Sequence, residues 1–214
     1  MTSLNIENVQ KFRDYGFVLT PVQKTLDKDD KKPKTKKGKW FYDWSDKELL
    51  EANRIGAYHK ESNIYDIDFD DKSFRAHKFI DLLPSTLTIG KKVNGKVIAT
   101  HKIYKKPNDV KFKPYSYPKS AGKGETIIET LSSTQTIIAG VDRVIINDVE
   151  PLSLDPSLLE PQLRMVAAFS ELLKHWPEKD KGLRDNAHLR LAGALARDTD
   201  IGLEIKEKFV ERLC

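Results

Sequence analysis

The pattern of apolar and polar positions changes about two thirds of the way along the chain. Short runs rich in β-branched and aromatic residues predict strands at 17–22, 55–59, 64–68, 87–89, 97–104, 126–131, 136–139 and 143–146. Helical spacing and capping signals predict helices at 4–15, 45–52, 71–82, 158–176, 185–197 and 202–213. The pattern predicts an α+β protein, with a mixed β-sheet and flanking helices followed by a small all-α helical bundle.

Three local signals support these boundaries. Ser45 and Glu48 have the spacing of a capping box, and Asn94-Gly95 is typical of a two-residue hairpin turn. Pro161 is expected in the first turn of a helix, where its missing N–H costs little. The segment 28–39 is too polar to pack, so we expect a mobile loop there. We place a domain boundary after residue 149, giving domains 1–149 and 150–214, and expect the helical part to be cut from a longer protein.

The strand that begins after Asn63 has a different chemistry on each face. Side chains alternate across a strand, so Asp66, Asp68 and Asp70 share one face, and Tyr65, Ile67 and Phe69 share the other. Neighbouring carboxylates repel one another unless water or a cation compensates. Aligned carboxylates suit Mg²⁺ or Mn²⁺. The alternative is a solvated strand end, and Asp70, where the strand is expected to finish, is the weakest metal candidate.

Positive charge gathers in the first part of the chain. The 214 residues carry a net charge of +5, but residues 1–149 hold 27 basic and 20 acidic residues, against 10 and 12 in 150–214. Ten lysines and a single acid, Asp109, lie between Lys91 and Lys123. A basic stretch beside an acidic strand predicts a polyanionic partner handled at a metal site. Lysines that only solubilise the surface are the alternative.

Two further polar residues interrupt apolar strands. His101 lies within the strand 97–104, and Glu129 follows two isoleucines in the strand 126–131. A carboxylate inside an apolar strand is costly to desolvate unless it is paired or binds a metal. Glu129 therefore needs a partner, either a basic side chain or a cation.

The order of these residues resembles that of a known family. Asp-x-Asp, then His, then Glu, each on its own strand, is similar to the archaeo-eukaryotic primase superfamily, in particular the primase-polymerases of phages and plasmids. The resemblance covers most of residues 12–148 and rests on the segments 15–22, 31–33, 39–40, 55–56, 65–68, 83–88, 100–104 and 127–130, with Gln135. One departure is Ala99, where the family usually has Ser. Residues 181–186 and 191–197 resemble the helical domain that follows the catalytic core.

The resemblance implies a site that binds metal ions, a nucleotide and a template strand. Asp66, Asp68 and Glu129 would bind two catalytic Mg²⁺ or Mn²⁺ ions, and His101 would contact the phosphates of the incoming nucleotide. Thr100 and Lys102 are further nucleotide-binding candidates, although Lys102 points to the other face of its strand. The lysines expected to hold template phosphates without reading sequence are Lys91, Lys92, Lys105, Lys106, Lys111 and Lys113.

We therefore predict a DNA primase-polymerase, a nucleotidyltransferase that starts and extends primers on single-stranded DNA from dNTPs or NTPs in phage or plasmid replication. A helicase domain downstream or in trans is a plausible partner. The alternatives are a metal-dependent nuclease and a non-catalytic single-stranded-DNA-binding replication module. The sequence has no apolar run long enough to cross a membrane and a single cysteine, Cys214, so we expect a cytoplasmic protein, in the host cytoplasm if it is phage-encoded.

Overall fold

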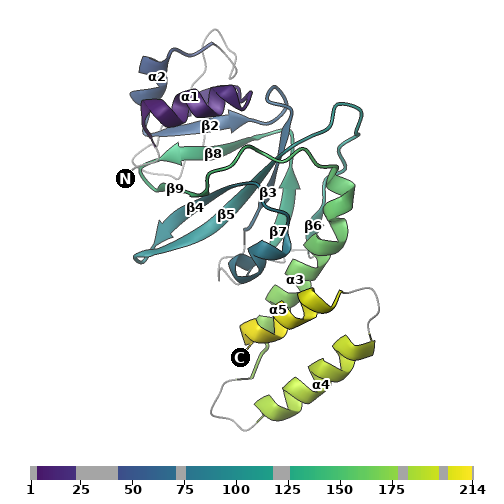
Figure 1. Ribbon diagram of the computed structural model, residues 1–214. Helices are drawn as coiled ribbons and strands as arrows, with labels where there is room; N and C mark the ends of the chain where they lie inside the picture. Colours follow the sequence, from purple (N-terminus) through teal and green to yellow (C-terminus); the bar gives the residue numbers. More distant parts are fainter. Residues whose placement is uncertain are drawn as a thin grey trace.

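The computed structural model describes residues 4–22, 43–70, 76–117, 126–177, 183–197 and 202–213, which form an α+β fold (Figure 1). The strands are β1 (Leu19–Val22), β2 (Arg54–Tyr58), β3 (Ile64–Asp68), β4 (Leu87–Val93), β5 (Lys96–Lys105), β6 (Ser116–Tyr117), β7 (Ile128–Leu131), β8 (Gln135–Gly140) and β9 (Arg143–Asn147). The α-helices are α1 (Ile6–Asp14), α2 (Asp46–Leu50), α3 (Glu160–Lys174), α4 (Arg184–Arg197) and α5 (Leu203–Leu213), and the 3₁₀ helices are η1 (Ala76–Leu82) and η2 (Pro156–Leu159). The predicted loop at 28–39 lies outside these residues.

The described strands form two antiparallel sheets. The large sheet has the order β6-β7-β3-β5-β4-β9, and the small sheet has the order β1-β2-β8. Strands β2 and β3, which follow one another in the chain, do not pair with each other: β2 pairs with β1 and β8, whereas β3 pairs with β5 and β7. The acidic strand is therefore a central strand, with a hydrogen-bonded neighbour on each side.

Local sequence signals correctly predicted several element boundaries. Asn94 and Gly95 both have positive φ angles, 49° and 77°, as the tight turn between β4 and β5 requires. Ser45 and Glu48 form the expected capping box at the start of α2, and a proline stands in the first turn of α3. The segment predicted as a helix over 71–82 is a 3₁₀ helix over its described part, and the two-residue strand β6 was not predicted.

Each face of the large sheet packs into a separate hydrophobic cluster. Tyr65 and Ile67 of β3 belong to a cluster with η1 and α3, whereas Ile64 belongs to a cluster with α1, β1, β2 and β8. The rings of Tyr65 and Tyr104 stack with centroids 5.4 Å apart. The even-numbered face of β3, which carries the aspartates, therefore looks toward the small sheet.

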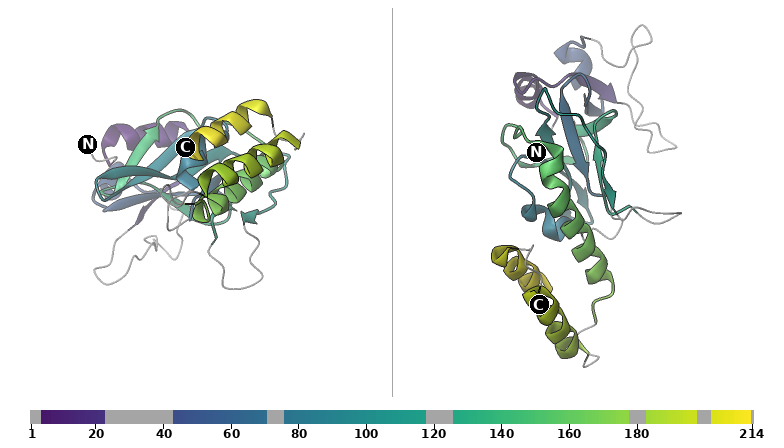
Figure 2. Two further views of the ribbon diagram at one scale, coloured as in Figure 1. Left: turned by 90° about the horizontal axis from the view of Figure 1, so that it is seen from below. Right: turned by 90° about the vertical axis from the view of Figure 1, so that its right-hand side faces the viewer.

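The C-terminal helices share a hydrophobic cluster with the large sheet. Helix α3 packs against η1 and the β6–β7 side of the large sheet (Figures 1 and 2). Its Phe169 ring contacts the rings of Phe79 in η1 and Phe209 in α5. One hydrophobic cluster thus includes residues on both sides of the boundary predicted after residue 149. The division into domains stays a prediction. None of the described helices combines the length and the apolar character needed to cross a membrane.

Candidate functional site

Three predicted site residues form a row across the centre of the large sheet. Asp68 on β3 lies opposite His101 on β5 and opposite Glu129 on β7. Residues opposite each other in an antiparallel pair point to the same face. Asp66, two residues before Asp68, shares that face. The fold thus brings all four residues to the side of the sheet that faces β1, β2 and β8.

A β-bulge interrupts β5 directly before His101. Ile89 of β4 lies opposite His101, and the next residue, Gly90, lies opposite Ala99, so Thr100 is an extra residue in β5. The Thr100 carbonyl accepts a hydrogen bond from the Phe69 backbone N–H at 2.9 Å. Bulges interrupt the regular alternation of a strand and redirect a side chain. Simple alternation along β5 therefore predicts the side on which His101 lies but not the position of Thr100.

His101 holds the two aspartates together. Its Nδ1 lies 2.8 Å from Oδ2 of Asp66 and 3.4 Å from Oδ1 of Asp68. An ionised carboxylate only accepts, so Nδ1 carries the proton that is donated. Asp66 is completely buried, His101 is 6% exposed, and the Asp68 side chain is 18% exposed. Asp66 therefore forms the floor of the site, with Asp68 nearer the solvent.

The chemistry of these side chains fits a hard divalent cation. Carboxylate oxygens are the ligands that Mg²⁺ and Mn²⁺ prefer, and Oδ1 of Asp66 is buried with no hydrogen-bond partner among the described residues. In the described ranges, no group of three or more His, Cys, Asp or Glu side chains is already arranged to hold a metal ion. The His101 proton lies between the two aspartates instead.

Arg143 brings positive charge to this face, which the sequence analysis did not anticipate. It is 7% exposed, and one of its terminal nitrogens, Nη1, donates to Oγ1 of Thr100 at 3.3 Å. Burial lowers the pKa of Arg143, and the charges of nearby acids, including Asp68 and Asp66, oppose that shift. A buried guanidinium beside the acids suits an anionic substrate. Only the pairing of β9 with β4 brings Arg143 here, so no local sequence signal could have found it.

His59 and Thr136 join the site from the small sheet. Thr136 on β8 donates its hydroxyl proton to Oδ2 of Asp66 at 2.5 Å, and Nε2 of His59 lies 2.7 Å from the same hydroxyl oxygen. His59 is fully buried and linked to Asp66 through Thr136. The signal that could have drawn attention to it is a histidine directly after an apolar strand.

Lys102 lies on the opposite side of the sheet. Its Nζ donates to the backbone carbonyls of Ile80 and Leu83, at 3.1 and 2.9 Å, and burial lowers the Lys102 pKa to about 8. The carbonyls that it binds are at the end of η1, whose last C=O groups have no partner within the helix. The structure thus gives Lys102 backbone partners on the face away from the acids, while Thr100 lies beside Arg143.

The predicted template-binding lysines lie in three different places. Lys91 and Lys92 are on β4 beyond the residue opposite His101, toward the hairpin turn. Lys105 is opposite Ile64, about 13 Å along β3 from Asp68, and its Nζ contacts Glu150 at 2.6 Å. Lys106, Lys111 and Lys113 belong to the connection from β5 to β6. Only Lys91 and Lys92, of these six, are at the His101 end of β5.

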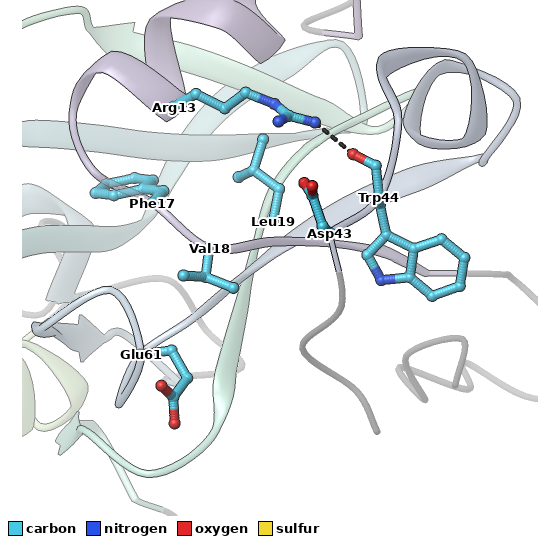
Figure 3. Close-up of a pocket in the computed structure, with 7 residues that line it drawn as sticks. All are labelled: Arg13, Phe17, Val18, Leu19, Asp43, Trp44 and Glu61. Atoms are coloured by element: carbon cyan, nitrogen blue, oxygen red, sulfur yellow. Dashed lines mark hydrogen bonds between the residues drawn. The ribbon is translucent and has the colours of Figure 1, made fainter. Parts of the chain in front are cut away.

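Other candidate positions lie apart from the row. Asp70 is exposed and follows the end of β3, in agreement with its lower rank among the metal candidates. A pocket of about 360 Å³ opens between α1, β1 and the start of α2. Figure 3 shows it lined by Arg13, Asp43 and Trp44, with Arg13 hydrogen-bonded to the Trp44 carbonyl. It contains none of the predicted site residues.

Comparison with known proteins assigns the chain to no family. No protein-family model matches the chain, and no curated protein is detectably similar to it in sequence. The function must therefore be argued from the site itself.

Proposed function

We propose that this chain is a DNA primase-polymerase with the fold of the archaeo-eukaryotic primase type. In this proposal it joins nucleotides on a single-stranded DNA template and both starts and extends primers. The observation that carries the proposal is the row of His101, Asp68 and Glu129 across three central strands, with Asp66 beside it. The order of these residues in the sequence is the one that the family resemblance requires, and the pairing of β5, β3 and β7 supports it.

Nucleotidyl transfer needs a 3′-hydroxyl in line with the α-phosphate and positive charge around the triphosphate. Asp66, Asp68 and Glu129 would hold Mg²⁺ or Mn²⁺, which activates the hydroxyl and neutralises the leaving pyrophosphate. Oδ1 of Asp66, which has no hydrogen-bond partner within the described part of the chain, supports this role.

The other residues of the site would bind the anionic substrates. The His101 ring directs Nδ1 to the aspartates, so Nε2, on the opposite edge of the ring, is the atom that would meet a phosphate. It would donate a hydrogen bond to that phosphate as the doubly protonated imidazolium, in which both ring nitrogens carry protons. Arg143, held by Thr100, would add a permanent positive charge beside it. Lys91 and Lys92 would contact template phosphates from the adjoining hairpin, where contacts to the backbone position a strand without reading its sequence.

The test is an assay of synthesis on single-stranded DNA with dNTPs and NTPs and with Mg²⁺ or Mn²⁺, each with and without a primer. We expect synthesis by the wild-type protein and none by Asp68→Asn. Asp70→Asn is the matched control, because it alters an exposed aspartate just past the same strand, and we expect it to retain activity.

Three outcomes would contradict the proposal. A wild-type protein that makes no product with either metal would exclude the polymerase function. Synthesis that survives both Asp68→Asn and Glu129→Gln would exclude the site. Degradation of the template without synthesis would favour the nuclease alternative.

A further inference from the structure

Asp66 is held by residues from both sheets. Its Oδ2 accepts a hydrogen bond from Thr136 in the small sheet and another from His101 in the large sheet. Since Asp66 is fully buried, water cannot replace either bond without a change in the packing. The rotamer of the Asp66 side chain is thus determined by two donors that approach from different strands.

The protons in this chain of hydrogen bonds can be assigned. The Thr136 hydroxyl has a single proton, and it is donated to the Asp66 carboxylate. His59 Nε2, 2.7 Å from the same oxygen, must then carry a proton and donate it to Thr136. His59 is consequently the Nε2–H tautomer, and its Nδ1 is buried with no hydrogen-bond partner among the described residues.

The backbone keeps His59 in place at the crossing between the sheets. Its N–H donates to the Thr134 carbonyl at 3.0 Å, and its carbonyl accepts from the Ile64 N–H at 3.0 Å. These bonds tie the end of β2 to the start of β8 and to the start of β3. Burial lowers the His59 pKa to about 4, so the ring is neutral near pH 7.

We propose that His59 and Thr136 are positioning residues, which orient the Asp66 carboxylate and, through it, the His101 ring. In this role they would act through Asp66, without touching substrate or metal. A chain of hydrogen bonds that crosses the boundary between the sheets would lock His101 with Nδ1 toward the aspartates and Nε2 toward the substrate. The consequence for synthesis rests on the proposed function, whereas the orientation of His101 does not.

The test uses variants that separate hydrogen bonding from packing. Thr136→Val removes the hydroxyl at nearly constant volume, and Thr136→Ser restores it. The double variant His59→Phe/Thr136→Val makes both partners apolar, so no buried donor is left without an acceptor. Thr130→Val is the matched control, because Thr130 is also a buried strand threonine, but its hydroxyl contacts the backbone of Tyr115.

The first readout is the ¹⁵N and ¹H NMR signature of the His101 ring in the full chain, at pH 7.5 and without metal. We expect wild type, Thr136→Ser and Thr130→Val to show one tautomer with a slowly exchanging Nδ1 proton. In Thr136→Val and in the double variant, that proton should exchange faster and both tautomers should be present. An unchanged His101 signal in these two variants would overturn the positioning role.

The second readout is the kinetics of primer extension. Partners behind a ligating residue typically contribute about 10- to 100-fold. We expect kcat to fall by about tenfold in Thr136→Val, with little change in the nucleotide KM and with recovery in Thr136→Ser. If Thr130→Val lowered kcat as much, the effect would be one of stability and the inference would fail. If the wild type made no product, the proposed function would fail, and the NMR result alone would decide the inference.

Discussion

The polar groups on the two faces of β3 differ in how fully they are hydrogen-bonded. On one face, Tyr65 and Ile67 lie under η1 and α3, and the polar group nearby, Nζ of Lys102, donates to two backbone carbonyls. On the other face, Asp66 and Asp68 share a single histidine, and one buried oxygen of Asp66 has no hydrogen-bond partner among the described residues. On the first face, the protein itself supplies the hydrogen-bond partners of Lys102. The second retains capacity for a ligand, which is the property expected of a site.

The largest expected effect tests the acidic face. Replacing Asp68 by Asn removes a negative charge without changing the size of the side chain. Because the proposed metal ligands and charge-stabilising groups each contribute strongly, we expect synthesis to fall by at least about 100-fold. The free energy of unfolding should change little or rise, because repulsion with Asp66 is relieved. Primer-extension rates and urea unfolding measure the two quantities. A stable and fully active Asp68→Asn protein would contradict the comparison.

The apolar face should show the reverse behaviour. Ile67→Ala leaves a cavity in the packed layer between β3 and the helices, and we expect it to lower the free energy of unfolding by about 3 kcal/mol. The folded fraction should keep a normal nucleotide KM, since Ile67 points away from the aspartates. Urea unfolding and steady-state kinetics at low temperature check this. A change in KM without a loss of stability would show that the two faces are not independent.

The pH dependence of stability tests the buried histidine on the polar face. His59 is neutral in the folded protein, with its pKa lowered to about 4, whereas an unfolded histidine titrates near 6.5. As the pH falls from about 6.5 toward 4, the unfolded state binds a proton that the folded state excludes, so stability decreases by up to about 3 kcal/mol. His59→Phe should remove this contribution. We would measure unfolding of both proteins at several pH values; parallel curves would contradict the prediction.

The lysines at the two ends of the central strands should differ in DNA binding. Changing Lys91 and Lys92 together to Gln should weaken binding to single-stranded DNA several-fold and make the slope of log K against log salt less steep by about 1.4. Lys105→Gln is the control at the other end of β3, where Nζ contacts Glu150. Fluorescence titrations at several salt concentrations check this. A slope change for Lys105→Gln of about 0.7, half that of the double variant, would mean that each lysine acts only through its charge.

The smallest effect on nucleotide binding is expected for Lys102. Lys102→Met should leave the nucleotide KM unchanged, because Nζ is bound to backbone carbonyls on the apolar face. Its lowered pKa, about 8, means that wild-type stability rises with pH between about 8 and 10.5, and the variant should lack that rise. Nucleotide titrations and unfolding at pH 7.5 and 10 give both values. A higher KM in Lys102→Met would restore Lys102 to the nucleotide site.

Local patterns predicted the positions of helices and strands more completely than the pairing of the strands. The Asn94-Gly95 turn, the Ser45 capping box and most strand positions depend on neighbouring residues, and the structure agrees with them. Which strands pair was not predictable in the same way. The chain passes from the large sheet to the small one between β7 and β8, over only three residues, and no local signal marks that change.

The residues of the candidate site also differ in whether local sequence patterns could identify them. Asp66, Asp68, His101 and Glu129 were found from their unusual positions in apolar strands and from their order. The contributions of Arg143, Thr136 and His59 were not, because each depends on contacts between residues at least 43 positions apart in the chain. Thr100 and His101 were identified, but the bulge at Thr100 was not.

The sequence by itself determined that one strand carries acids on one face and large apolar residues on the other, because alternation is a property of the extended backbone. Only the tertiary structure decided what meets each face. It placed His101 and Glu129 on either side of Asp68, Lys102 against the end of η1, and the His59–Thr136 pair behind Asp66. Those contacts come from strand pairing and sheet packing. Both depend on the whole chain, so the residues adjacent in sequence do not predict them.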